Sequence, residues 1–373
     1  MNRAWIELDF EALKSNIEHY RSAVPETTRI IAVVKADAYG HGAAVIAGFL
    51  QQELGFDLFA VASLDEAVEL RSSGIHGDIL VLGYTDPEFF GDLVRYQITQ
   101  AIPDKEYGWA LERYGREQGT PVTAHIAVDT GMHRIGLLPE EIEVMAGLYR
   151  SPDIRITGIF SHLCVADSCE PEQVDFTLTQ CRRYQQVLEE LRSYGVADPG
   201  LRHILNTYAA VNYPEFAYDA VRAGLMLLGV RSESGDYLRE DLALRPVLSL
   251  KSHITSVREI RPGETVSYGR VFTATRTTRV ASLAIGYADG IPRCLSGKLR
   301  AIVNDTLVTN IGRICMDQLM LDVTDAGDVR VGDEAILIGS SGSCEISAGE
   351  LAEHSGTITN EILSRFGKRL EHA

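Results

Sequence analysis

Short apolar runs and amphipathic segments alternate along the first part of the chain. The apolar runs predict strands at residues 30–35, 58–62, 79–82, 99–102, 123–128, 155–160, 203–205 and 220–222. Helical spacing of apolar positions predicts helices between most of them, at residues 42–54, 65–73, 87–96, 105–118, 139–149 and 172–194. Because strands that alternate with helices form a parallel sheet, eight such strands predict an α/β barrel of the TIM type.

The pattern changes near residue 235. Alternating apolar and polar positions predict further strands at residues 248–257, 278–284, 301–303, 319–323 and 335–338, and helical spacing returns at residues 347–354 and 360–366. A chain of 373 residues is long enough for two domains. We therefore expect a barrel over residues 10–235 and a mainly β C-terminal domain over residues 236–373, which the N-terminal strand at residues 1–9 joins.

Composition narrows the class of protein. The hydrophobic fraction of 45% and charged fraction of 23% are ordinary for a globular chain, whereas the net charge of −17 argues against a nucleic-acid partner. Six cysteines show neither paired metal-ligand spacing nor a disulfide framework, so we expect free thiols and no metal site. The chain begins without a signal-peptide core and has no apolar run of the roughly 20 residues that a membrane helix needs. We therefore expect a cytoplasmic location.

The first predicted barrel strand ends in a lysine with unusual surroundings. Lys35 follows an apolar β-branched run, and Tyr39, Gly40 and Gly42 come directly after it. A lysine at the end of an apolar strand is poorly solvated, which favours its neutral amine. A neutral amine is what an aldehyde cofactor needs to form a Schiff base. The alternative interpretation is a lysine whose charged end reaches solvent.

Other polar residues follow later strands of the predicted barrel. Arg134 lies in the loop after the fifth strand, His162 ends the sixth, Asn206 and Thr207 follow the seventh, and Arg222 ends the eighth. Each alone is typical of a core residue or a surface ion pair. Because functional groups of such barrels gather at the C-terminal ends of the strands, their shared placement predicts one site.

These segments resemble a known family. Residues 32–42 are similar to the cofactor-lysine signature of alanine racemases, the pyridoxal-phosphate enzymes with a barrel fold. The likeness runs from residues 5–9 to the final helix, and in the second domain it covers residues 266–270, 285–290 and 312–318. The resemblance implies a barrel followed by a β domain, pyridoxal 5′-phosphate as cofactor, and a homodimer with a composite active site.

The resemblance also implies which residues hold the cofactor. It assigns the covalent bond to Lys35 and phosphate binding to Tyr39, Thr207 and the backbone amides of Gly224 and Leu225. Amides at the start of a helical turn are suited to a phosphate on physical grounds as well.

Further cofactor contacts follow from the same resemblance. Asn206 belongs to the cofactor-binding set, and Arg134 is expected at the cofactor's phenolic oxygen and at the substrate carboxylate. Arg222 is expected to face the pyridine nitrogen and, being effectively always protonated, to keep that nitrogen unprotonated. His162 is expected to link Arg222 to Tyr268.

Racemisation needs two bases on opposite faces of the reacting carbon. The resemblance implies Lys35 on one face and Tyr268, from the partner subunit, on the other. A free tyrosine titrates near ~10, so Tyr268 needs a lowered pKa to act as a base. The resemblance also implies that Asp317 and the Met316 backbone, both from the partner subunit, lie near the substrate carboxylate, and that Tyr287 contacts the substrate.

Two positions depart from the family pattern. Ala127 stands where many members have a carbamylated lysine that steadies the arginine, so Arg134 must be oriented otherwise or sit more loosely. Asn360 stands where the family has tyrosine; a smaller amide opens space and adds a donor and an acceptor. This substitution resembles the membrane serine racemases of vancomycin-resistance systems. Those proteins have a membrane-embedded half that this sequence lacks, so we interpret the chain as an excised catalytic module that is tethered to a membrane domain in its full-length form.

The sequence therefore predicts a racemase of L-serine and L-alanine that supplies D-amino acids for cell-wall precursors. Four alternatives remain open: a housekeeping alanine racemase, a barrel-type amino-acid decarboxylase, a single-barrel cofactor-binding protein without turnover, and a weakly active module that assembles with a membrane partner. A binding protein would lack the β domain and Tyr268, and the segments at Tyr268 and Asp317 fit racemases better than decarboxylases.

Overall fold

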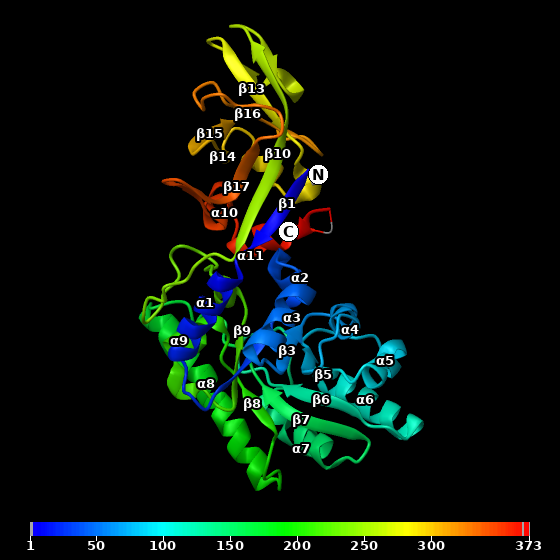
Figure 1. The fold of residues 1–373 in the computed structure, drawn as a ribbon. Coiled ribbons are helices and arrows are strands. Elements are labelled where there is room, and N and C mark those ends of the chain that lie inside the picture. Colours follow the sequence, from blue (N-terminus) through cyan, green and yellow to red (C-terminus); the bar gives the residue numbers. More distant parts are fainter. Residues whose placement is uncertain (1–2, 368, 373) are drawn as a thin grey trace.

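A computed structural model describes residues 3–367 and 369–372 as two domains, each with its own hydrophobic core. The barrel, drawn from blue to green, forms the lower domain in Figure 1, and the mainly β domain, drawn from yellow to red, stands above it. The blue strand β1 (Ala4–Leu8) belongs to the upper domain, so the chain starts in the second domain before it builds the first. The expected order of a barrel followed by a β domain is confirmed.

Eight parallel strands form the barrel wall, in the order β8-β7-β6-β5-β4-β3-β2-β9. Their bounds are β2 (Arg29–Val33), β3 (Leu58–Val61), β4 (Asp78–Val81), β5 (Thr99–Ile102), β6 (Val122–Ala127), β7 (Ile154–Phe160), β8 (Leu201–His203) and β9 (Ala220–Ala223). Strands β8 and β9 meet through single hydrogen bonds, from Asp219 N–H to the carbonyl of Arg202 (3.1 Å) and from Arg222 N–H to the carbonyl of Leu205 (3.0 Å). These contacts complete the near-closed TIM-like barrel.

Helices cover the outside of the barrel. They are α1 (Phe10–Ser22), α3 (Ala43–Leu54), α4 (Leu64–Ser72), α5 (Phe90–Arg95), α6 (Lys105–Gln118), α7 (Ile142–Arg150), α8 (Pro171–Ser193) and α9 (Thr207–Asn212). Local sequence explains many of their ends. The Asp104 side chain, for example, accepts the Tyr107 N–H at the start of α6, and Gly119 ends that helix in the left-handed conformation.

The second domain is built on a nine-stranded sheet ordered β18-β17-β14-β15-β16-β13-β10-β1-β19. After β1 the strands are β10 (Leu248–Ile260), β13 (Thr278–Leu283), β14 (Arg300–Val303), β15 (Thr306–Asn310), β16 (Leu319–Asp322), β17 (Glu334–Ser341), β18 (Cys344–Ile346) and β19 (Glu371–His372), with a small hairpin of β11 (Thr265–Val266) and β12 (Phe272–Thr273). Helices α10 (Ala348–Ser355) and α11 (Thr359–Ser364) close the domain on its barrel side (Figure 1). Antiparallel pairing of β1 with β10 ties the N-terminal strand to this sheet.

Most predicted elements are present within one or two residues. The seventh barrel strand is shifted by two residues, because β8 covers Leu201–His203 rather than residues 203–205. Helix α1 and the strands β15 and β18 were not predicted, and residues 87–96 form a 3₁₀ turn followed by the short α5. Short strands such as β18 exist only because a neighbouring strand pairs with them, which local sequence does not reveal.

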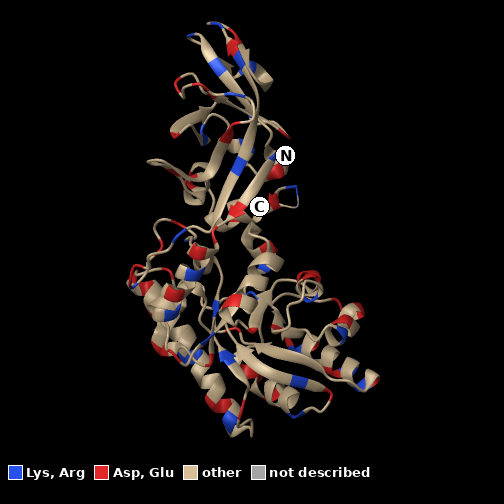
Figure 2. Cartoon of the chain, viewed as in Figure 1, with Lys and Arg blue, Asp and Glu red and all other residues tan. Residues whose placement is uncertain are grey.

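Acidic and basic residues are interspersed along the ribbon of both domains (Figure 2), so the net charge of −17 is not confined to one of them. Within the described residues, no helix combines the length and the apolar character that crossing a membrane requires.

Candidate active site

The predicted cofactor lysine opens a turn of unusual backbone conformation. Lys35 starts the short segment α2 (Lys35–Gly40), in which Ala36 to Tyr39 all have φ between 50° and 55° and ψ between 44° and 49°. This is a left-handed helical turn made of non-glycine residues, and each costs roughly 1–2 kcal/mol relative to the right-handed conformation. We predicted a loop leading into a helix here, and propensity rules contain no signal for such a turn.

Neighbouring groups hold this strained turn in place. The Glu66 carboxylate, from α4, accepts the N–H of Ala36 and that of Ala62, both at 2.7 Å. Asp37 Oδ1 accepts the Ala43 N–H at the start of α3 (2.6 Å). Gly40 packs so closely on the second domain that a Cβ there would lie 2.2 Å from the Leu363 carbonyl oxygen. Strained backbone of this kind persists where the surroundings over-determine it, and it is concentrated at functional sites.

Three residues predicted to bind a phosphate lie together. The Gly224 N–H donates to Thr207 Oγ1 (3.1 Å), and a Cβ on Gly224 would lie 2.8 Å from the Tyr39 hydroxyl. Leu225 follows Gly224 and begins the 3₁₀ turn η4 (Leu225–Leu228). The hydroxyl groups of Tyr39 and Thr207 therefore lie together at Gly224, beside the start of a helical turn. Asn206 caps α9: its side chain accepts the Ala209 N–H at 3.0 Å.

Arg222, on β9, is buried inside the barrel and 3% exposed. Its guanidinium donates to His203 Nδ1 (2.7 Å), to His162 Nδ1 (3.2 Å) and to the carbonyls of His203 and Ser161 (2.9 and 2.7 Å), and it lies 5.3 Å from the centre of the Phe160 ring. Burial lowers the pKa of Arg222 to about 10, so the group stays protonated at neutral pH. The predicted contact between Arg222 and His162 is present.

Two hydrogen-bonded histidines, His203 and His125, adjoin Arg222 and were not predicted from the sequence. His203 Nε2 lies 3.1 Å from His125 Nδ1, and both rings are buried. Burial lowers the pKa of His203 well below its usual value and that of His125 to about 3. Because Arg222 donates to His203 Nδ1, the proton of His203 is on Nε2, from which it is donated to His125. The available signal was a histidine in each of two predicted strands.

Four predicted cationic or titratable groups converge at the C-terminal end of the barrel strands. Burial, followed by the charge of Arg134 and, to a smaller extent, Arg222, lowers the pKa of Lys35, and Glu66 opposes this shift. Burial and then the charges of Arg222, Arg134 and Lys35 lower the pKa of His162 well below its usual value. The surroundings therefore favour a neutral amine on Lys35 and a neutral imidazole on His162.

Arg134 and Ala127, the position that departs from the family pattern, line the same small cavity. Arg134 is exposed and makes no hydrogen bond or ion pair within the part of the chain that the structure describes. Ala127 is buried and lines, together with Arg134 and His162, a cavity of about 20 Å³. A short side chain at residue 127 leaves space where a longer one would reach the arginine.

Tyr268 lies apart from Lys35 within one chain. Tyr268 is 70% exposed, Met316 52% and Tyr287 40%. The yellow-green segment that contains Tyr268 lies at the end of the second domain remote from the barrel (Figure 1). None of the groups that shift the pKa of Lys35 comes from this domain. A single chain therefore does not bring Tyr268 to the barrel site.

Asn360 lies on α11, where the second domain meets the barrel. Its Oδ1 accepts the Ser232 hydroxyl (2.7 Å), and the neighbouring Thr359 N–H donates to the Ser232 carbonyl (2.9 Å). The sequence predicts that the Asn360 amide offers a ligand both a donor and an acceptor. The structure engages the acceptor, so the Nδ2 group is the one left for a ligand among the described contacts.

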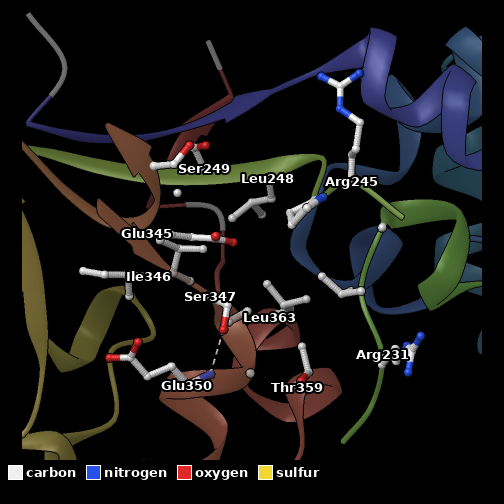
Figure 3. Close-up of a pocket in the computed structure, with 18 of the residues that line it drawn as sticks. Arg231, Arg245, Leu248, Ser249, Glu345, Ile346, Ser347, Glu350, Thr359 and Leu363 are labelled. Atoms are coloured by element: carbon white, nitrogen blue, oxygen red, sulfur yellow. Dashed lines mark hydrogen bonds between the residues drawn. The ribbon is translucent and has the colours of Figure 1, made fainter. Parts of the chain in front are cut away.

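A cavity of about 680 Å³ lies elsewhere, between the two domains (Figure 3). Leu248, Ile346 and Leu363 form part of its wall. The guanidinium groups of Arg231 and Arg245 point away from it, toward their partners Asp241 and Asp9 (2.5 and 3.1 Å). None of the predicted site residues lines this cavity. Cavity size alone would therefore indicate a region other than the predicted site.

Comparison with known proteins agrees with this geometry. Residues 8–232 match the family described as alanine racemase, N-terminal domain, and residues 247–373 match alanine racemase, C-terminal domain. The chain is 39% identical to alanine racemase 1 of Clostridium acetobutylicum over 368 residues, which cover 98% of this chain and 94% of the relative.

A longer relative and a solved structure are also similar to this chain. The chain is 37% identical over 369 residues to an amino-acid racemase of Enterococcus faecalis, covering 99% of this chain and 51% of that longer protein. The solved structure of the alanine racemase of Clostridium difficile 630 superposes with a TM-score of 0.93 at 33% identity and covers 100% of this chain and 95% of that one.

Proposed function

Because the chain belongs to the alanine racemase family, whose members depend on pyridoxal phosphate, we propose that it racemises serine and alanine with Lys35 and Tyr268 as the two bases. The observation that carries the proposal is the convergence of Lys35, Arg134, His162 and Arg222 at one end of the barrel.

The residues present fit pyridoxal phosphate. The hydroxyls of Tyr39 and Thr207 lie together at Gly224 and next to the start of η4, and a group of donors of this kind suits a phosphate. Lys35 would hold the aldehyde, and Arg222 would face the ring nitrogen. When bound, the cofactor withdraws electrons from the amino acid and thereby acidifies its Cα–H.

The chain's own residues would then accept and donate the protons. The lowered pKa of Lys35 favours the neutral amine, which can accept the Cα proton on one face. We assign the other face to Tyr268 of the partner subunit, because Tyr268 is exposed and remote from the barrel within its own chain. The permanently charged Arg222 would keep the ring nitrogen unprotonated, which limits side reactions of the carbanion. On this proposal the active site is complete only in a homodimer.

Asn360 supports serine as a substrate. Ser232 occupies its Oδ1, which leaves the Nδ2–H₂ group to donate to a substrate hydroxyl. A site built to hydrogen-bond a hydroxyl discriminates more strongly than one that fits a methylene. The 37% identical relative in Enterococcus faecalis is named an amino-acid racemase, and the 39% identical relative is an alanine racemase, so we retain alanine as a second substrate. We propose that the D-amino acids serve cell-wall precursors.

Chiral product analysis tests the proposal. The purified protein, supplied with pyridoxal phosphate, is incubated separately with L-serine and L-alanine, and the enantiomers are separated. We expect D-serine and D-alanine to accumulate toward equal amounts of the two enantiomers. Release of CO₂ without a D-product would instead identify a decarboxylase, and D-alanine without D-serine would reduce the function to that of an alanine racemase.

A further inference from the structure

Two loops of the second domain carry the predicted substrate contacts and are joined to each other. We call residues 285–290 and 313–318 the substrate loops. The Tyr287 N–H donates to the Cys315 carbonyl and the Ala288 N–H to the Met316 carbonyl, both at 3.0 Å. They approach so closely at Gly286 that a Cβ there would lie 2.3 Å from the Cys315 carbonyl oxygen. The two loops therefore form one platform.

A buried carboxylate anchors the first of these loops. The Asp289 side chain is fully buried and accepts the Gly286 N–H (2.9 Å) from its own loop. Arg3, near the N-terminus, binds the same carboxylate through both Nη atoms, at 3.1 and 2.5 Å. A buried carboxylate with this many donors has its hydrogen-bonding capacity satisfied.

Arg369, from the C-terminal segment, connects the two loops. Its Nε lies 3.3 Å from Asp289 Oδ1, and its Nη2 donates to Asp317 Oδ1 at 2.7 Å. The side chains of Arg369 and Asp317 are 45% and 57% exposed, so this ion pair contributes only about 0–1 kcal/mol to stability. This ion pair therefore matters more for the charge near the substrate than for the stability of the fold.

Asp317 presents a physical difficulty as a substrate contact. A free carboxylate there would repel the carboxylate of an amino acid. The backbone N–H groups of Met316 and Asp317, in contrast, form no hydrogen bond within the described residues, and both residues are exposed. Unbonded N–H groups can bind an anion.

We infer that Arg369 is a positioning residue that neutralises Asp317 and fixes the substrate loops, so that the Asp317 carboxylate does not repel the substrate carboxylate expected beside the Met316 backbone. This inference rests on the proposed function. It extends that function by giving the C-terminal segment a role in substrate affinity.

Propionate, a carboxylate without an amino group, provides a test that does not depend on turnover. Its Kd is measured by calorimetry on the cofactor-loaded wild type, on Arg369→Met, and on the double variant Arg369→Met with Asp317→Asn. We expect Arg369→Met to raise the propionate Kd about tenfold. The added Asp317→Asn substitution should return it to within about threefold of wild type, because it removes the uncompensated charge.

Arg365→Met is the matched control, because it removes an exposed ion pair with Glu361 from the same part of the chain and should leave the propionate Kd unchanged. An unchanged Kd in Arg369→Met, or a raised Kd that Asp317→Asn does not reverse, would overturn the inference. The KM for L-alanine should follow the propionate Kd while kcat changes less than about threefold. Failure to form any D-amino acid would refute the proposed function separately, since the propionate measurement needs no turnover.

Discussion

Arg222 donates a hydrogen bond to Nδ1 of His203 across 2.7 Å inside the barrel, and this contact determines how the buried histidines are protonated. His203 must carry its proton on Nε2, which faces His125 at 3.1 Å. The Arg222 guanidinium, which is expected to meet the cofactor, therefore contacts the neutral ring of His203, and His203 in turn contacts the neutral ring of His125. Three predictions concern this buried group or the cofactor lysine beside it, and two concern ligand binding.

Replacing His203 with leucine removes the acceptor from a buried, charged guanidinium. We expect the free energy of unfolding to fall by about 2–4 kcal/mol, because an uncompensated donor on a buried charge is costly. Urea denaturation of wild type and His203→Leu measures the loss. His76→Leu, at an exposed position, is the control. A loss below about 1 kcal/mol in His203→Leu would show that the carbonyl contacts and His162 suffice to hold Arg222.

Stability should decrease on mild acidification. The pKa of His125 is about 3 in the folded chain and near ~6.5 when unfolded, so between these values the unfolded state binds more protons. The free energy of unfolding therefore falls as pH decreases from about 6.5 toward 3, by up to about 1.4 kcal/mol per pH unit for each such histidine. Thermal unfolding at pH 7, 6, 5 and 4 measures this slope. The slope should be smaller in His125→Asn; an identical slope would assign it to other groups.

The two proposed bases should separate by spectrum and by direction. Lys35→Ala should lose both racemisation and the visible absorbance of covalently bound cofactor, because no other amine takes its place. Tyr268→Phe should keep that absorbance and lose racemisation in both directions, because the enantiomers have equal free energy and kcat/KM must fall equally from each. Exchange of the Cα proton with solvent deuterium should persist for the D-enantiomer, through Lys35, and be lost for the L-enantiomer. Absorbance spectra, racemisation rates and deuterium incorporation into each enantiomer measure these effects, with Lys14→Ala as an exposed control. Undiminished racemisation by Tyr268→Phe, or equal exchange of both enantiomers, would refute the two-base assignment.

Gly224→Ala should weaken cofactor binding. Its Cβ would lie 2.8 Å from the Tyr39 hydroxyl, so the phenol must move or the phosphate site must narrow. We expect the Kd for pyridoxal phosphate to rise about tenfold, measured by fluorescence titration. Gly147→Ala on α7 is the matched control, because a Cβ there meets nothing within 4 Å. A helical alanine should leave cofactor affinity unchanged and slightly stabilise the fold, by about 0.5–1 kcal/mol.

Substrate preference should depend on Asn360. We expect Asn360→Tyr to lower the ratio of kcat/KM for serine to that for alanine by about tenfold or more, because the variant removes the Nδ2 donor and fills the space. Steady-state rates with both amino acids measure this ratio. Ser232→Ala, which frees Asn360 Oδ1, should reduce the ratio to a smaller degree. A ratio that is the same in wild type and Asn360→Tyr would remove Asn360 as the determinant.

Several features could be predicted because they depend on neighbours in sequence. Lys35 at the end of an apolar strand, the alternation that gives the barrel, and the change of pattern near residue 235 are local properties. Residues after different strands, such as His162 and Arg222, could be grouped because parallel strands deliver their C-terminal ends to one face.

The sequence by itself determined the barrel, the β domain, the family and the residue types at the candidate site, because hydrophobic periodicity and motif spacing are written along the chain. Only the tertiary structure decided the left-handed turn after Lys35, the histidine pair behind Arg222 and the bridge from Arg369 to Asp289 and Asp317. Each of these depends on groups from distant segments: Glu66 and Leu363 hold the turn, and Arg3 and Arg369 both contact Asp289. Such contacts repay strain and desolvation only after the chain has folded, so no local pattern predicts them.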